Sequence, residues 1–217
     1  MTRARTKQPA TYQDVLDAPE HMVAEILNGE LHLSPRPASP HARASSRLGH
    51  YLGPFDDPED DEPGGWIILD EPELHLAAHV LVPDLGGWRR ERMPEMPRAP
   101  FFTLAPDWVC EVASPSTQSP RDPACPGPAE AALLAAQAQG GTEGRPRPCI
   151  DRMLKMPIYR EAGVEWLWLV DPEAHLIEVF RGDGRGWTLA AQAAGAGLVR
   201  LPPFEAIELD PGRWFRD

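Results

Sequence analysis

The chain has 217 residues, of which 42% are hydrophobic, so it can bury one sizeable core as a single domain over residues 1–217. Its 33 acidic and 21 basic residues give a net charge of −12, which excludes broad, non-specific attraction to nucleic acid. The three cysteines form no Cys-x-x-Cys pair, and no segment approaches the ~18 consecutive apolar residues of a membrane helix. We therefore expect a soluble cytoplasmic protein without a zinc site, a disulfide framework or a membrane anchor.

The first part of the chain predicts a short helix and a hairpin. Residues 11–18 combine acids in the first turns with spaced apolar residues, which is typical of a short helix. The pair Asn28 and Gly29 predicts a two-residue hairpin loop, because both turn positions need a positive φ. In that register Glu25 pairs with His32 on a polar face, and the opposite face is core.

A longer helix and several strands are predicted next. The helix covers residues 39–55, and the segment 56–62 is interpreted as a solvated acidic turn. The apolar stripe of the helix is expected to consist of Ala42, Leu48, Tyr51 and Leu52. Strands are predicted over residues 66–69, 73–76 and 79–84. Pro83 lacks an amide hydrogen, so the last strand should end there and leave Asp84 at the terminus of a sheet.

The second half of the chain predicts further strands around one helix. Residues 86–106 are expected to form a long loop, and residues 108–113 a strand buried on both faces. Residues 118–148 have the composition of a flexible insertion. A helix should follow over residues 151–163, with Pro157 either kinking it or lying in its first turn. The last strands are expected over 166–170, 176–180 and 187–191. These elements predict an α/β or α+β sheet protein.

Glu111 is the most informative residue, because it interrupts the apolar strand predicted over residues 108–113. Burying an unpaired carboxylate costs several kcal/mol or more, so such a group is usually paired, protonated or bound to a metal. Asp84, at the end of another predicted strand, is the expected neighbour. Two carboxylates cannot neutralise each other, which points to a cation between them.

Lys155 is the candidate third member of this site. Of the 21 basic residues only Lys7 and Lys155 are lysines, so the chain uses lysine at 155 despite a strong preference for arginine. Lysine is a compact point charge whose pKa can be shifted, whereas arginine stays protonated. The alternative is that Asp151 and Lys155 form an ordinary i,i+4 pair on a helix surface.

Other polar residues give weaker indications. Two groups of basic residues are candidate contacts to DNA, although each residue is interpreted more simply as a solvated side chain. They are Arg36, His41, Arg43 and Arg47 in one region and Arg89, Arg90, Arg92 and Arg98 in another. Five histidines show no metal-ligand spacing and are interpreted as surface or strand residues: His32, His41, His50, His75 and His79. The seven tryptophans are expected to be core and sheet anchors.

Five motifs, in matching order, resemble one known family. They are Glu-Ile-Leu-Asn-Gly-Glu-Leu at 25–31, Val-Pro-Asp at 82–84, Glu-Val-Ala-Ser-Pro-Ser-Thr at 111–117, Tyr-Arg-Glu-Ala-Gly at 159–163 and Trp-Leu-Val-Asp-Pro at 168–172. The set resembles the Uma-type restriction endonucleases of the PD-(D/E)XK nuclease superfamily. The resemblance implies a restriction-endonuclease-like mixed β-sheet flanked by helices. It also implies a Mg²⁺-dependent endonuclease that hydrolyses phosphodiester bonds in DNA.

The resemblance implies roles for particular residues. Asp84 and Glu111 would ligate Mg²⁺, for which Mn²⁺ is a substitute, and Lys155 would be the catalytic lysine. In this branch the lysine comes from the helix after the Glu strand, because Ala113 fills the usual Glu-x-Lys position. Two further acids match supporting positions, Glu25 and Asp151.

Two departures from the family pattern leave other functions open. About 30 residues separate Thr117 from Asp151, where the family places the helix soon after the turn. A displaced helix would leave a catalytically inactive module that binds nucleic acid or protein. The acidic net charge would also suit a metal-dependent hydrolase of small phosphoesters. A homodimer is a family-level expectation, since two active sites make it easier to cut both strands.

Overall fold

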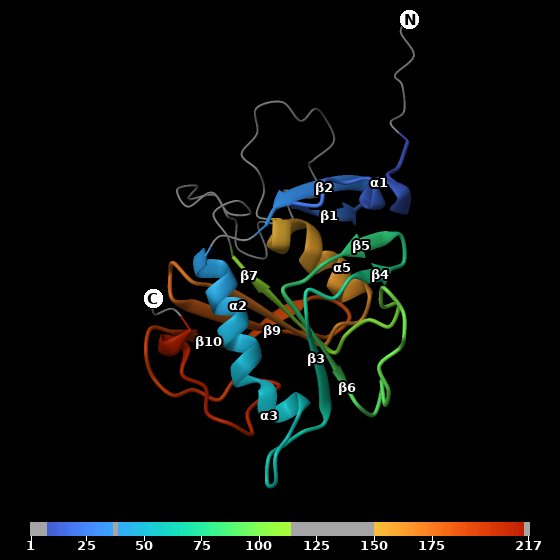
Figure 1. Cartoon of the computed structure of the whole chain (residues 1–217). Helices are drawn as coiled ribbons and strands as arrows, with labels where there is room; N and C mark the ends of the chain where they lie inside the picture. The colour runs from blue at the N-terminus through green and yellow to red at the C-terminus, as the bar shows by residue number, and fades with distance from the viewer. Residues whose placement is uncertain (1–7, 37–38, 114–149, 215–217) are drawn as a thin grey trace, which may run out of the picture.

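The computed structural model describes residues 8–36, 39–113 and 150–214 (Figure 1). The insertion expected at 118–148 lies outside these residues. Within the described part of the chain, the strands form one six-stranded and one four-stranded sheet, and short helices pack against them. None of the helices described there has the length and apolar character that crossing a bilayer requires.

The six-stranded sheet forms the centre of the fold. Its order is β10-β9-β8-β7-β6-β3, and β7 and β8 are the parallel pair in an otherwise antiparallel sheet. A parallel pair requires a crossover connection, and helix α5 (Met156–Glu161) lies between the two strands in the chain. The strands are β3 (Trp66–Asp70), β6 (Leu85–Arg89), β7 (Trp108–Val112), β8 (Trp166–Asp171), β9 (Leu176–Gly182) and β10 (Trp187–Ala194).

The four-stranded sheet, in the order β2-β1-β5-β4, contains the predicted hairpin. Asn28 and Gly29 have φ values of 53° and 78°, and Glu25 pairs with His32 as expected. The expected division into a core face and a polar face does not hold along the hairpin, because Glu25 is 4% exposed while Leu33 is 40% exposed. The strands are β1 (Met22–Leu27), β2 (Glu30–Pro35), β4 (Leu74–Leu76) and β5 (His79–Leu81).

Different elements cover the two faces of the central sheet (Figure 1). Helices α2 (Ser39–Tyr51) and α3 (Gly53–Asp56) lie on one face with the C-terminal segment, whereas α5 and the four-stranded sheet lie on the other. The single helix predicted over residues 39–55 is divided, because Pro54 has no amide hydrogen with which to continue α2. The remaining helical segments are α1 (Tyr12–Leu16), a π-helical turn (Asp151–Lys155) and a 3-10 turn (Pro211–Arg213).

Side chains alternate along β7, which directs Glu111 to a defined face of the sheet. Trp108 and Val112 belong to the core beneath α2, and Val109 belongs to the core beneath α5. Glu111 therefore faces α5. Most tryptophans are core residues as predicted, and the fully buried ones are Trp88, Trp108, Trp168 and Trp214.

The prediction of a long loop over residues 86–106 is wrong at its start, where the chain forms β6 (Leu85–Arg89). Two adjacent glycines weaken the sequence signal for a strand. The packing accounts for one of them, because a Cβ at Gly86 would lie 2.9 Å from Cγ of Pro72. The preceding strand β5 ends at Leu81, so Asp84 stands immediately before β6 instead of at the end of β5.

Candidate active site

Two carboxylates meet where β6 and β7 lie side by side. The antiparallel register pairs Leu85 with Cys110, so Asp84, one residue earlier, lies opposite Glu111. Asp84 stands immediately before β6 and Glu111 near the end of β7, which places both at the same end of the central sheet. The structure therefore brings together the two carboxylates that the sequence analysis paired.

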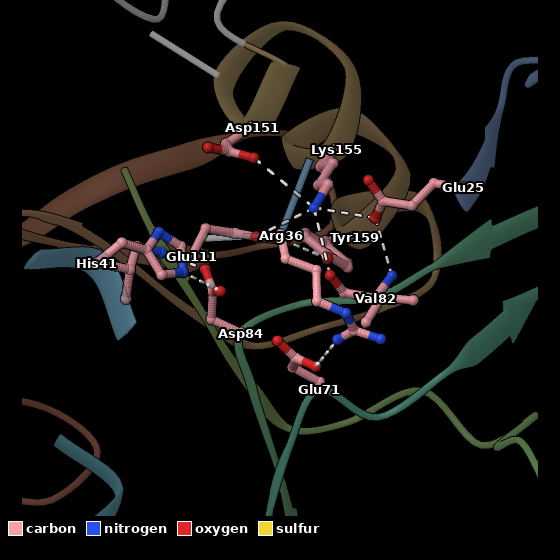
Figure 2. A network of polar contacts seen from close by, with 11 residues as sticks. Glu25, Arg36, His41, Glu71, Val82, Asp84, Glu111, Asp151, Lys155 and Tyr159 are labelled. Carbon is pink, nitrogen blue, oxygen red and sulfur yellow. Dashed lines mark hydrogen bonds and ion pairs between the residues drawn. The ribbon is translucent and has the colours of Figure 1, made fainter. Parts of the chain in front are cut away.

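Both carboxylate oxygens of Asp84 accept hydrogen bonds (Figure 2). The backbone N–H of Val112 donates to Oδ2 at 2.6 Å, and Nε2 of His41 lies 2.6 Å from Oδ1. An ionised carboxylate only accepts, so Nε2 is the donor to an ionised Asp84. Burial lowers the pKa of His41, but the hydrogen bond to Asp84 and its charge raise it, and the net shift is upward. This pair joins α2 to the end of the central sheet.

Lys155 lies among three carboxylates, of which Glu111 is one (Figure 2). Its Nζ is 3.0 Å from Oε1 of Glu25 and 3.1 Å from Oε2 of Glu111. The distance to Oδ1 of Asp151 is 3.8 Å. Lys155 and Asp151 are each 5% exposed, so the alternative of an ordinary surface pair is wrong.

The helical segment before β8 places two polar side chains on Glu111. The π-helical turn ends at Lys155, and Pro157 lies in the first turn of α5, which is one of the two predicted arrangements. Proline disfavours a regular α-helical turn before it, which accounts for the wider π turn. Residues four apart share a helix face, so Tyr159 lies on the same face as Lys155. The Tyr159 hydroxyl donates a hydrogen bond to Oε1 of Glu111 at 2.5 Å.

Glu25 connects the hairpin to the segment that leads into Asp84. Its Oε1 accepts a hydrogen bond from the N–H of Val82 at 2.8 Å and also contacts Lys155. Strand β1 pairs with β5 just before this segment. Glu25, predicted as a supporting residue, thus holds Lys155 and the 82–84 segment together. All five predicted site residues belong to one cluster.

Negative charge exceeds positive charge in this cluster. Four carboxylates, from Glu25, Asp84, Glu111 and Asp151, surround one lysine and one histidine. Burial raises the pKa of Glu111 well above its usual range, although the charge of Lys155 opposes that shift. Burial also raises the pKa of Asp151 to about 6. Glu111 and Asp151 therefore bind protons more tightly than free carboxylates do.

Lys155 keeps its positive charge in this setting. Burial alone lowers the pKa of a lysine, but the surrounding carboxylates raise that of Lys155 well above its usual value. Its ammonium group is therefore a permanent donor within the cluster at physiological pH.

The donor chemistry fits a divalent cation of the Mg²⁺ type. Mg²⁺ prefers oxygen ligands, keeps several waters and often uses only one or two protein carboxylates. Asp84 and Glu111 supply two carboxylates, and each has lone pairs beyond its present hydrogen bonds. Among the residues that the structure describes, no three His, Cys, Asp or Glu side chains form a ready metal cage. Water or substrate would have to complete the coordination.

His41 is the site residue whose contact with Asp84 sequence reasoning missed. Its interpretation as a surface or strand residue is wrong, since it is 6% exposed and bonded to Asp84. The sequence contained a signal for the burial of His41, because His41, Ala44 and Leu48 follow helical spacing. These three residues form the buried side of α2. The predicted stripe began instead at Ala42, which is exposed.

The two groups of arginines have different surroundings. Arg89 and Arg92 form ion pairs with the buried Asp107, at 3.2 and 2.8 Å, and so have a structural role. Arg36 pairs with Glu71 at 3.6 Å, and both side chains are exposed (Figure 2). The backbone N–H of Glu71 donates to the carbonyl of Asp84 at 3.0 Å, which links this pair to the site. Only the first arginine group therefore contributes a described side chain next to the site.

The fold and the site together define a mixed α+β protein with a buried cluster of carboxylates and lysine at the strand ends of its central sheet. The sequence profile of the Uma2 family, described as "Putative restriction endonuclease", matches residues 9–212, and the chain belongs to this family. None of the curated proteins matches the chain.

A solved structure shares the fold. It is the crystal structure of a putative nuclease belonging to DUF820 from Anabaena variabilis, with a TM-score of 0.59 and 20% sequence identity. The alignment covers 95% of this chain and 98% of that one. The expected fold class, a restriction-endonuclease-like mixed sheet flanked by helices, is confirmed.

Proposed function

We propose that the protein is a Mg²⁺-dependent DNA endonuclease that hydrolyses phosphodiester bonds at Asp84, Glu111 and Lys155. The observation that carries this proposal is the buried excess of carboxylates around one lysine at the ends of β6 and β7. Membership of the Uma2 family supports a nuclease over other metal-dependent hydrolases. A divalent cation would balance the excess negative charge.

Asp84 and Glu111 would hold the cation. Once bound, Mg²⁺ would act as a Lewis acid on the scissile phosphate and lower the pKa of a coordinated water. His41 and the Val112 N–H hold Asp84, while Tyr159 holds Glu111. Both carboxylates are therefore oriented before substrate arrives, which lowers the reorganisation needed during the reaction.

Lys155 would act on the substrate phosphate. Glu25 and Glu111 hold its ammonium group in place, and the surrounding carboxylates keep it charged. A fixed ammonium beside a phosphodiester can orient the attacking water or stabilise charge that develops on the phosphate oxygens. Asp151 would assist by keeping the lysine side chain directed into the cluster.

A second function, the hydrolysis of small phosphoesters, is favoured by the net charge of −12. An acidic surface repels a polyanion such as DNA, and small substrates suffer less from this repulsion. The pairing of Arg89 and Arg92 with Asp107 further reduces the positive charge available to a nucleic acid. Parallel assays with plasmid DNA and bis(p-nitrophenyl) phosphate would separate the two functions.

The test is plasmid nicking by the purified full chain in Mg²⁺, Mn²⁺ and EDTA. We expect cation-dependent nicking, and we expect Asp84→Asn, Glu111→Gln and Lys155→Met each to lower it by a factor on the order of 10² or more. Asp183→Asn, in an exposed turn, is the matched control and should nick like the wild type.

Three outcomes would contradict the proposal. Nicking that persists in EDTA would show that the reaction needs no divalent cation. Nicking by folded site variants would show that these residues do not form the active site. A folded wild-type protein that binds DNA without cutting it would instead support the inactive binding module.

A further inference from the structure

His41 is a polar residue on the otherwise apolar side of α2. Its neighbours on that side, Ala44 and Leu48, pack into the core between α2 and the central sheet. From there Nε2 reaches Oδ1 of Asp84 at 2.6 Å (Figure 2). Helix α2 therefore contacts the site from the face of the sheet opposite to α5.

The contact restricts the orientation of the Asp84 carboxylate. One oxygen is held by the N–H of Val112 in β7, and the other by His41 in α2. The terminal torsion of an aspartate is intrinsically broad, so one hydrogen bond leaves the carboxylate free to turn. Two donors from two separate elements hold it in one orientation and direct its remaining lone pairs.

Packing alone does not explain a histidine at this position. Nδ1 is buried and makes no hydrogen bond of normal geometry within the described residues, although the carbonyl of Ala113 contributes to raising the pKa of the ring. A buried polar atom without a good partner destabilises a fold, whereas an apolar side chain would match Ala44 and Leu48. What the histidine adds to the structure is its bond to Asp84.

We propose that His41 is a positioning residue that fixes the Asp84 carboxylate in the orientation required to bind the divalent cation. The inference rests on the proposed function, because it takes Asp84 as a cation ligand. His41 does not touch the reacting atoms and acts only through Asp84. Loss of a group that orients a metal ligand typically lowers metal affinity by ~10–100-fold.

The experiment compares His41→Leu, His41→Gln and the wild type as full chains without nucleic acid. Mn²⁺ affinity is measured by isothermal titration calorimetry, and the melting temperature is measured in EDTA. We expect His41→Leu to bind Mn²⁺ ~10–100-fold more weakly. His41→Gln should restore most of the affinity, because the glutamine amide can donate from nearly the same place as Nε2. His50→Leu, at an exposed position of the same helix, is the control and should bind like the wild type.

Two readouts separate positioning from a merely structural role. His41→Leu should lower the melting temperature in EDTA, because Asp84 loses one hydrogen-bond donor. Leu48→Ala, a buried variant on the same side of α2, should lower it at least as much and leave Mn²⁺ affinity unchanged. A merely structural role of His41 would make Mn²⁺ affinity fall with stability in both variants. A cation-free crystal structure of His41→Leu should show the Asp84 carboxylate turned away or in more than one rotamer.

The inference and the proposed function can fail separately. An unchanged Mn²⁺ affinity in His41→Leu, or an unchanged Asp84 orientation in its crystal structure, would overturn the positioning role. If the wild type binds no Mn²⁺, the cation-dependent function fails, and positioning for a cation falls with it. If the wild type binds Mn²⁺ but cuts no DNA, the role of His41 in cation binding stands and the nuclease function is refuted.

Discussion

Replacing Lys155 with methionine should destabilise the protein in a pH-dependent way. Methionine keeps most of the side-chain volume but removes the ammonium group, which lies 3.0 Å from Glu25 and 3.1 Å from Glu111. Removing one partner of a buried ion pair typically costs about 3–5 kcal/mol, because the remaining charges stay buried without compensation. At pH 8 we expect a loss of this size, which corresponds to a fall in melting temperature of roughly 6–20 °C for a chain of this length.

The loss should be smaller at pH 5. Burial raises the pKa of Glu111 and of Asp151, so protons can replace the missing ammonium group at low pH. Urea unfolding in EDTA at pH 5 and pH 8 measures both losses. Arg213→Met, at an exposed side chain, is the control and should change stability by less than about 1 kcal/mol at either pH. A Lys155→Met protein as stable as the wild type at pH 8 would refute the view that the lysine compensates the buried carboxylates.

Three further predictions concern the other groups of the cluster. The raised folded-state pKa of Asp151, about 6 against 3.8, means that its contribution to stability is complete below pH 4 and is lost as the pH rises through 6. In EDTA it should account for roughly 2–2.5 kcal/mol of lost unfolding free energy between pH 4 and 7, and Asp151→Asn should flatten that profile. Parallel pH profiles of the wild type and Asp151→Asn would contradict this. Mg²⁺ at 100 times its Kd should stabilise the wild type by about 2.7 kcal/mol in thermal unfolding, and Asp84→Asn should abolish the effect. Tyr159→Phe should lower the unfolding free energy by about 1–3 kcal/mol, because Glu111 loses a buried donor; an unchanged value in urea unfolding would count against that bond.

The carboxylate pair could be predicted because its chemistry is local. An acid inside an apolar strand needs a partner wherever that strand lies, so Glu111 was conspicuous without any knowledge of the fold. Lys155 was conspicuous because the chain otherwise uses arginine almost throughout. Neither signal depends on which other segments pack nearby.

His41 and β6 escaped prediction because their roles depend on distant segments. A histidine on a helix is polar in any local pattern, and only the approach of α2 to the end of β6 makes it a partner of Asp84. The two glycines of β6 argue against a strand until Pro72 and the neighbouring strands are in place. The role of His41 and the formation of β6 therefore both depend on tertiary packing.

The amino-acid sequence by itself determined the local elements of this protein: the hairpin register at Asn28 and Gly29, most of the strands, and the acids and lysine that carry the chemistry. These follow from backbone preferences and from the period of apolar residues, which act over a few neighbours. The tertiary structure decided that Lys155 meets Glu25 and Glu111, that His41 holds Asp84, and that the carboxylates outnumber the cations in one buried space. The physical reason is that burial and pairing of charge depend on which distant segments pack together, and it is this packing that shifts the pKa values and creates the proposed cation site.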